Sequence, residues 1–582
     1  MSKENTYNTG LLVTVASFLL ISSFLYFQLI VPYHLFFKEQ IQLFIFNSTY
    51  ILSYFSKPGG LACLTGDFLT QFFYLRGGGA IVISLLFVFE WLLIVRILHS
   101  FDLNRTASLW ALLPIIAEWA YISEINASIA MTVAFALVLL TICFYSRIQN
   151  KTVSLIMGIL LVPVLYVLLG SSMFLFPVFV LQYEIHSGKK RYLYWLLLIA
   201  FAVIFPLLLR ICYLITVVQA FLYPYVEIKQ VISLFAIAVI LFLASIKKIR
   251  KQRISFFSIM FILLFILVLG IGSLAVVTNI QREKIVGMAT EAYFENWDKV
   301  LRIAGKKEIK NPIATYYANI ALSKQMQMGD RMIEYYQPFT SGLFLPVNPE
   351  SNWFVIFFSN DVYYHIGDMN MAQHSAMLGM TFSPYQRSAR LIQRLIEINL
   401  VTEDFPAAMK YIRMLESSLF HRKKAAKLKE TALTTQPDNH ARLQKKRSQI
   451  HTNDFLRSSQ NQQFSLELLV KTNPENQAAL DYLLAYHLMN KNIPGFFDTY
   501  SSYCKDKTNY VPRAYAEALL IYFAVSKTKP EIITEYRINP GLIKDFNEYT
   551  QLYESTNGNL ELLKNKFPDT YWLFYHFATK KT

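Results

Sequence analysis

The sequence is poor in charged residues and in cysteine. Only 16% of its 582 residues are charged, well below the usual share in soluble domains, whereas 54% are hydrophobic and the mean hydropathy is +0.34. The four cysteines, Cys63, Cys143, Cys212 and Cys504, have neither metal-ligand spacing nor a disulfide pattern. These scarcities exclude a disulfide-stapled or zinc-knuckle domain and indicate an integral membrane protein.

The sequence also lacks the common motifs of soluble enzymes. There is no Walker loop, no dinucleotide glycine fingerprint, no G-x-S-x-G elbow and no H-E-x-x-H. Asp361 and His365 lie one helical turn apart, a spacing more typical of a surface pair than of a metal site. The net charge of +16 does not indicate nucleic acid, because many basic residues cluster beside apolar runs. We predict no nucleic-acid partner.

The first half of the chain alternates between long apolar runs and short polar connections. An apolar run of about 20 residues is long enough to span a bilayer as a helix. The N-terminal run has no cleavage site after it and is interpreted as an uncleaved first span. We predict about nine spans, at roughly 11–31, 80–98, 107–122, 127–146, 153–170, 172–186, 192–214, 229–246 and 254–278.

The distribution of lysine and arginine predicts the orientation of these spans. About twelve basic residues fall in one set of connections, against about five in the other set, and the richer set is expected on the cytoplasmic side. This places the N-terminus inside, and the loop 32–79 and everything after residue 279 outside. The predicted location is a bacterial inner membrane, with a periplasmic C-terminal domain and the lipid bilayer as a partner. The basic residues that carry the prediction are Arg96, Arg105, Arg147, Lys151, the stretch ending at Arg191 and the stretch 247–253.

The segment 280–582 has no spanning run and is predicted to be an all-α domain. Residues 311–338, 395–420 and 473–504 each have the outline of two amphipathic helices separated by a polar turn. Such pairs resemble a degenerate tetratricopeptide-repeat array, which implies a surface for protein partners. An ordinary helical bundle is the alternative. A basic stretch at about 421–452 is interpreted as a linker or solvated helix pair, or as a contact for anionic headgroups.

The loop 32–79 is too polar to span and too aromatic to be a plain solvated loop. Its aromatic residues favour two helices lying at the membrane surface, separated by the helix breakers Pro58, Gly59 and Gly60. Asp67 is expected near the beginning of the second helix, where a carboxylate favours the positive helix end. The loop therefore predicts isolated carboxylates at the boundary between water and lipid.

This organisation resembles the multi-pass glycosyltransferases of the GT-C class. The resemblance implies transfer of a sugar from a polyprenyl-phosphate donor to an envelope acceptor on the extracytoplasmic face, with acidic residues of the outer loops as catalytic base or metal ligand. Glu39 and Asp67 are then the candidates in the first outer loop, and Glu118 and Glu124 those in the second. Unlike that class, the first loop has no paired acidic motif. The stretches "YHLFFKEQIQLF" and "KPGGLACLTGDFLTQFFY" resemble an uncharacterised family of multi-pass proteins from Bacteroidetes, which implies no function.

The same resemblance assigns Arg76 and Arg210 to the donor phosphate. For Arg210 the alternative is a structural ion pair with Glu118 or Glu227, and for Arg76 it is a contact with lipid headgroups. Glu90 lies within the second span, where it is expected to be neutral or hydrogen-bonded, or to take part in proton or ion movement. The cofactor is unknown, and a divalent metal ion is left open.

Two other functions fit the same sequence. A non-enzymatic scaffold would use its repeat-like outer domain to recruit partners for envelope assembly, and a transporter or lipid-handling protein would use the spans. Replacement of Glu39, Asp67 or Glu124 by alanine or the matching amide separates the enzyme from the scaffold. It should abolish the activity of an enzyme without loss of folded protein, and it should be nearly silent in a scaffold.

Overall fold

The computed structural model describes residues 9–101, 107–188, 191–224, 232–245, 256–433, 441–451, 461–507, 510–528 and 530–579. Its regular elements are all helices, and these residues contain no strand, so the all-helical prediction is confirmed. The basic stretch 247–253, Lys189, Lys190 and Arg105, used above for orientation, lie outside the described residues, as does Glu227. The chain divides into two compact units. A membrane unit comprises residues 1–280 with Ser417–Arg422, and a C-terminal unit comprises 281–416 with 423–582.

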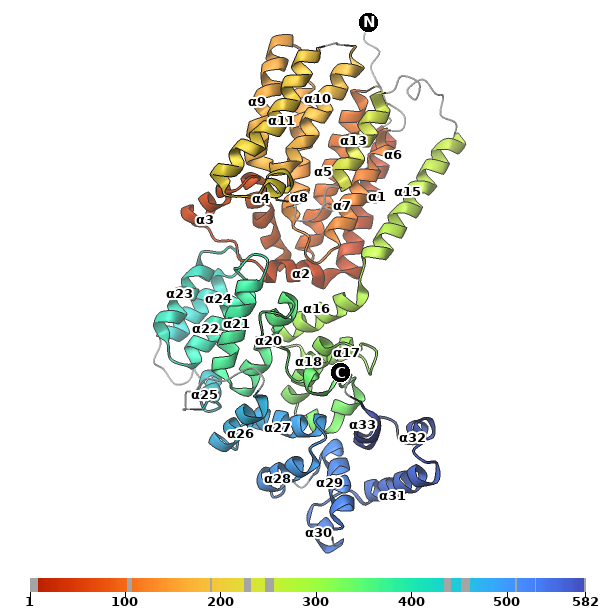
Figure 1. Cartoon of the computed structure of the whole chain (residues 1–582), viewed down its shortest axis with the longest axis vertical. Coiled ribbons are helices and arrows are strands. Elements are labelled where there is room, and N and C mark those ends of the chain that lie inside the picture. Colours follow the sequence, from red (N-terminus) through yellow and green to blue (C-terminus); the bar gives the residue numbers. More distant parts are fainter. Residues whose placement is uncertain are drawn as a thin grey trace. The chain divides into compact units, whose positions relative to one another are not determined.

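The membrane unit is built from long apolar helices (Figure 1). Among the described residues five stretches are long and apolar enough to cross a membrane, fewer than the nine we predicted: Gly10–Ile30, Gly78–His99, Lys151–His186, Tyr192–Tyr213 and Ile259–Val277. Three shorter apolar stretches, Ala107–Ile122, Ile129–Tyr145 and Ile232–Ala244, do not reach that length. The helices are α1 (Thr9–Leu25), α5 (Gly78–His99), α6 (Ala107–Trp110), α7 (Leu112–Ile122), α8 (Ile129–Tyr145), α9 (Lys151–Leu169), α10 (Leu175–His186), α11 (Tyr192–Tyr213), α12 (Val217–Leu222), α13 (Ile232–Ser245) and α15 (Phe256–Val277).

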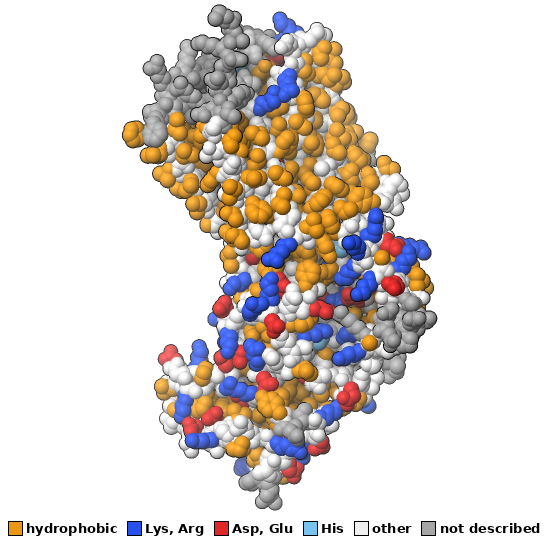
Figure 2. Space-filling view, turned by 180° about the vertical axis from the view of Figure 1, so that it is seen from behind, with side chains coloured by type: hydrophobic (Ala, Val, Ile, Leu, Met, Phe, Trp, Pro, Cys, Tyr) orange, Lys and Arg blue, Asp and Glu red, His pale blue; other side chains and the backbone are white. Residues whose placement is uncertain are grey.

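Apolar side chains cover the outside of this unit as well as its core. On α15, Phe257, Phe261 and Val276 are 75%, 70% and 88% exposed. Figure 2 shows hydrophobic side chains over the visible face of the membrane unit, whereas charged side chains are spread over the C-terminal unit. Such a surface is stable only in an apolar solvent, and a membrane-embedded protein is therefore indicated.

The loop 32–79 folds into short helices that pack onto the membrane unit. They are α2 (Pro32–Gln40), α3 (Ser48–Ser53) and α4 (Gly60–Thr70), followed by the 3₁₀ turn Gln71–Tyr74. The chain enters α4 through Gly59, whose φ of +77° favours glycine, and the Gly59 N–H donates to the carbonyl of Val167 at 3.0 Å. Asp67 is the eighth residue of α4, so our expectation that it lies near the helix beginning was wrong. The glycines set an earlier start, and the positive helix end does not explain this carboxylate.

Two of the three helix pairs predicted in the C-terminal unit are present. Residues 395–420 contain most of α22 (Ala389–Val401) and all of α23 (Phe405–Glu416), and residues 473–504 contain α27 (Gln477–Met489) and α28 (Ile493–Tyr503). Residues 311–338 form α18 (Pro312–Lys324), then only a four-residue helix, α19 (Met328–Arg331), and the 3₁₀ turn Met332–Glu334. A tetratricopeptide-like repeat is not confirmed. In the basic stretch 421–452, α24 (Arg422–Leu433) and α25 (Ala441–Arg447) are helical.

The remaining helices of the C-terminal unit are labelled in Figure 1. They are α16 (Ile280–Tyr293), α17 (Trp297–Ala304), α20 (Trp353–Ile366), α21 (Met369–Phe382), α26 (Gln462–Thr472), α29 (Arg513–Ser526), α30 (Pro530–Glu535), α31 (Pro540–Ser555), α32 (Leu560–Lys566) and α33 (Tyr571–Phe577).

Candidate functional site

Glu39 forms a buried pair with a histidine from a distant part of the sequence. The Glu39 Oε1 atom lies 2.6 Å from His421 Nε2, and both side chains are almost fully buried. His421 belongs to Ser417–Arg422, the short segment that is part of the membrane unit. The Glu39 Oε2 atom is buried and has no hydrogen-bond partner among the described residues. One carboxylate oxygen is thus held in place, while the other is buried without a hydrogen-bond partner among the described residues.

Lys38, the residue before Glu39 in α2, is buried against the loop that follows α7. Its Nζ atom donates to the carbonyl of Ile122 at 2.7 Å and interacts electrostatically with Glu124. Burial lowers the pKa of Lys38 to about 7, and the Glu124 carboxylate partly offsets that effect. Two adjacent residues of α2 therefore place a basic side chain and a carboxylate in the same folded loop.

Glu124 also lines an open cavity of about 750 Å³ within the membrane unit. Its wall is otherwise almost entirely apolar and comes from α7, α13 and α15. Its volume lies within the range of ordinary ligand sites. We call it the apolar pocket, and its lining residues are Leu113, Ile116, Ala117, Ala120, Tyr121, Glu124, Ile232, Ala236, Leu269, Gly272, Ser273, Val276 and Val277.

Asp67 belongs to a different group of side chains. Its Oδ2 atom accepts a hydrogen bond from the Tyr54 hydroxyl at 2.7 Å, and the hydroxyls of Tyr54 and Tyr50 are 2.6 Å apart. Burial raises the pKa of Asp67 to about 7, although the Tyr54 hydrogen bond acts in the opposite direction. Gln42, just beyond α2, donates to the Asp67 carbonyl at 3.2 Å and connects the two halves of the loop.

Glu118 and Glu90 lie together in the interior of the helix bundle. Glu118 Oε2 accepts from the Thr132 hydroxyl at 2.8 Å, and Ser233 is its second hydrogen-bond partner. Glu90 is fully buried and close enough to Glu118 for electrostatic coupling, but neither of its oxygens has a hydrogen-bond partner among the described residues. The pair connects α5, α7, α8 and α13.

The two arginines assigned to a phosphate are not brought into this group by any contact. Arg76 is exposed between the 3₁₀ turn and α5, and Arg210 is half-buried in the last turn of α11. Within the described residues neither forms an ion pair. The structural alternative in which Arg210 pairs with Glu118 is not found, because Glu118 bonds to Thr132 and Ser233.

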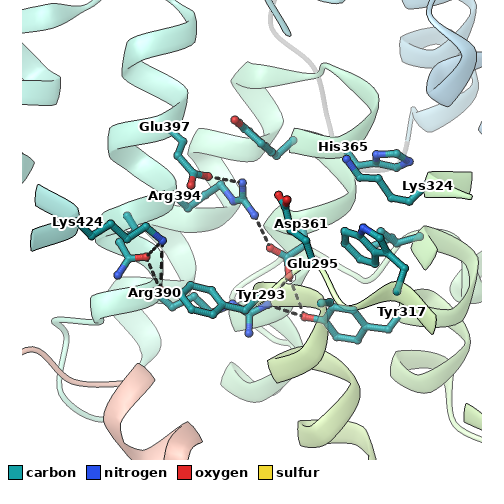
Figure 3. Close-up of a pocket in the computed structure, with 15 residues that line it drawn as sticks. Tyr293, Glu295, Tyr317, Lys324, Asp361, His365, Arg390, Arg394, Glu397 and Lys424 are labelled. Atoms are coloured by element: carbon teal, nitrogen blue, oxygen red, sulfur yellow. Dashed lines mark hydrogen bonds and ion pairs between the residues drawn. The ribbon is translucent and has the colours of Figure 1, made fainter. Parts of the chain in front are cut away.

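The C-terminal unit holds a second cavity, of about 80 Å³, lined by charged and aromatic side chains (Figure 3). At its centre Asp361 accepts from three donors: Arg390 at 2.7 Å, Arg394 at 3.0 Å and the Tyr317 hydroxyl at 2.8 Å. The guanidinium groups hold the pKa of Asp361 below its usual range despite its burial. We call this the basic cavity, and its lining residues are Ala292, Tyr293, Glu295, Trp297, Tyr317, Ile320, Lys324, Asp361, Tyr364, His365, Arg390, Gln393, Arg394, Glu397 and Lys424.

Sequence comparison places the chain in an uncharacterised group. The model of DUF6057, a family of unknown function, matches residues 6–578. The chain belongs to this family. An uncharacterised family was expected, and that part of the prediction is confirmed. No curated protein and no solved structure matches the chain.

Several residues of these sites were missed by reasoning from sequence. Lys38 begins the polar run "KEQIQ". The interruption of an aromatic segment by this run could have indicated a site residue. Tyr54 looked like one more aromatic residue of an amphipathic face. His421 had no signal at all, because 382 positions separate it from Glu39.

Proposed function

We propose that this protein is a membrane glycosyltransferase of GT-C-like type, which transfers a sugar from a polyprenyl-phosphate donor to an envelope acceptor on the extracytoplasmic face. The observation that carries the proposal is the apolar pocket, which includes Glu124 next to the buried ammonium of Lys38. An apolar pocket between exposed apolar helices suits a lipid chain. Lys38, whose charge interacts with the pocket residue Glu124, is proposed to bind the phosphate of that lipid.

Lys38 has the properties that a phosphate site needs. Its pKa of about 7 leaves it only partly charged at neutral pH, and a bound phosphate would raise that pKa and keep the ammonium positive. The ammonium of Lys38 would stabilise the phosphate more strongly as the bond to the sugar breaks and negative charge develops on the leaving phosphate. Arg76 and Arg210 remain further candidates for that phosphate.

We assign the role of general base to Glu39. Its Oε2 atom is buried and has no partner in the part of the chain that the structure describes, and the His421 contact holds the other oxygen. In the reaction Oε2 takes the proton of an acceptor hydroxyl, the hydroxyl oxygen bonds to the anomeric carbon, and the bond to the donor phosphate breaks. Asp67 is the alternative base. We assign Glu124 to positioning the substrate, and Glu118 to holding the helices of the bundle together.

The proposed orientation needs an odd number of crossings. We propose nine crossings: the five long stretches, with Lys151–His186 counted as two, and the three shorter apolar stretches, which do not reach spanning length by themselves. The 36-residue stretch Lys151–His186 is divided at Gly170, whose φ is +65°, into α9 and α10. This count supports a cytoplasmic N-terminus and a periplasmic C-terminal unit in an inner membrane. A reporter fused to the C-terminus tests it.

The proposal is tested in cells of the native host that carry E39Q on the chromosome. Polyprenyl-phosphate sugars are extracted and measured by liquid chromatography and mass spectrometry. One such lipid should accumulate in E39Q and not in E475Q, whose exposed carboxylate forms only a surface pair with Lys507. Unchanged lipid profiles in E39Q, D67N and E124Q cells that contain normal amounts of the protein would contradict the proposal.

The second candidate function is a membrane-anchored scaffold for envelope assembly. It is favoured by the two helix pairs of the C-terminal unit, α22 with α23 and α27 with α28. In a scaffold E39Q would be silent, whereas loss of the C-terminal unit would abolish function. A truncation after residue 280 would also remove His421, which belongs to the membrane unit, so the point substitution is the sharper of the two tests.

A further inference from the structure

The basic cavity of the C-terminal unit has no role in the proposed transfer reaction. It is lined by four basic side chains and three carboxylates, a formal charge of +1. Asp361 is fully engaged by Arg390, Arg394 and Tyr317, and Glu397 accepts from Arg394 at 2.7 Å. The excess positive charge is therefore not neutralised by the carboxylates at the centre of the cavity.

Lys424 contributes to this excess positive charge. Its Nζ atom lies 2.5 Å from Gln393 Oε1 and 3.4 Å from the Tyr293 hydroxyl, both neutral groups. It also lies over the Tyr293 ring, 4.9 Å from its centre. Within the described residues Lys424 forms no ion pair with a carboxylate. Figure 3 shows Lys424 on one side of the cavity and Lys324 on the other, with Asp361 between them. An ammonium held among neutral groups in a part-buried site gains most from an added anion.

The size and wall of the cavity limit what that anion can be. A volume of about 80 Å³ admits a few water molecules or a compact ligand, but not a nucleotide or a sugar chain. Tyr293, Trp297 and Tyr364 supply aromatic surface for a small apolar group. A single excess positive charge favours a monoanion.

We propose that the basic cavity is a binding site for a compact carboxylate, in which Lys424 pairs with the carboxylate group and the aromatic wall contacts its apolar remainder. The guanidinium of Arg394, packed 4.0 Å from the centre of the Tyr364 ring, is a fixed second donor. The carboxylate is that of a free small acid or of a peptide C-terminus, and the two share the same recognition chemistry.

The test uses the full-length protein in nanodiscs and follows the fluorescence of Trp297, with W297F to identify its signal. Sodium acetate is titrated against sodium chloride at constant ionic strength, and tri-alanine is compared with tri-alanine amide. We expect a saturable change that weakens at least tenfold in K424Q, is restored in K424R and is unchanged in K423Q. Lys423 is the exposed neighbour on the same helix, outside the cavity. A response to tri-alanine but not to its amide assigns the site to peptide C-termini, and a response to acetate alone assigns it to small acids.

Three results would overturn the proposal. They are no saturable response in the wild type, an equal response in K424Q that unfolds at the wild-type temperature, and tighter binding of inorganic phosphate than of either carboxylate. Because Glu39 is not part of this cavity, E39Q should bind acetate normally. Failure of the transfer reaction and failure of this site are therefore distinguishable.

Discussion

Glu39 and His421 are 382 positions apart in the sequence, and their side chains meet at 2.6 Å in the membrane unit. The contact is part of a larger attachment of the segment Ser417–Arg422. The Phe46 N–H donates to the Ser417 carbonyl at 2.8 Å, and the Phe420 ring stacks on Tyr74 with centroids 6.0 Å apart. A short segment following α23 thus completes the surroundings of a carboxylate in the first loop.

The first prediction concerns His421. H421A removes the partner of a buried carboxylate, and a hydrogen bond of this kind contributes about 1.5–3 kcal/mol. We expect a lower unfolding temperature and at least a tenfold loss of donor turnover in H421A, with partial recovery of both in H421Q, which retains a donor. H374Q, at an exposed histidine, is the control. The measurements are thermal unfolding by intrinsic fluorescence and the donor level in cells. Wild-type behaviour of H421A would show that the contact is incidental.

The second prediction concerns pH and Asp67. Burial raises its folded-state pKa to about 7 from an ordinary 3.8, so the folded state binds a proton that the unfolded state releases between about pH 4 and 7. The contribution of Asp67 to stability is thus complete below about pH 4 and lost as the pH rises through 7, and about three pKa units correspond to about 4 kcal/mol. D67N removes this dependence while keeping an acceptor for Tyr54.

We therefore expect D67N to unfold at a higher temperature than the wild type at pH 8, and the difference to shrink at pH 5. Thermal unfolding across this pH range is the measurement, and D506N, at an exposed carboxylate, should follow the wild type. A difference that does not change with pH would show that Asp67 titrates normally.

The third prediction concerns the packing of α4 on α8. A Cβ added at Gly66 would lie 2.5 Å from Ala130 Cα and 2.6 Å from Ala130 N, and backbone atoms cannot move aside as a side chain can. G66A should destabilise the protein by about 1–3 kcal/mol or prevent its accumulation. G272A, where a Cβ meets nothing within 4 Å, is the matched control in α15. Equal unfolding temperatures for the two variants would contradict this close packing.

The fourth prediction concerns Glu90. A buried carboxyl group without a hydrogen-bond partner destabilises the fold relative to an apolar side chain of similar shape. E90M should raise the unfolding temperature, whereas E118M should lower it, because it leaves Thr132 and Ser233 without their acceptor. Thermal unfolding of both variants is the measurement. A stabilised E90M that has lost donor turnover would indicate a functional role for Glu90, and a destabilised E90M would contradict the argument.

Features that depend on local sequence could be predicted, whereas contacts between residues far apart in the sequence could not. Apolar runs such as that of α15 specify helices through composition alone, so the all-helical class followed from the sequence. The start of α4 depended on the backbone at Gly59, and a local pattern placed Asp67 at the wrong end of the helix. The Glu39 to His421 contact and the Arg390 to Asp361 ion pair depend on tertiary packing, which periodicity does not encode. The carboxylates of the first loop could be singled out, but their partners could not.

The proposed proton transfer by Glu39 in the turnover of a polyprenyl-phosphate sugar is tested with purified protein. Lipids from E39Q cells are added to purified wild-type or E39Q protein in nanodiscs, together with an envelope acceptor extract, and release of polyprenyl phosphate is followed by mass spectrometry. We expect the wild-type protein to consume the accumulated lipid and release polyprenyl phosphate, and E39Q to be at least a hundredfold slower. Equal release by the two proteins, or no release by either, would contradict it.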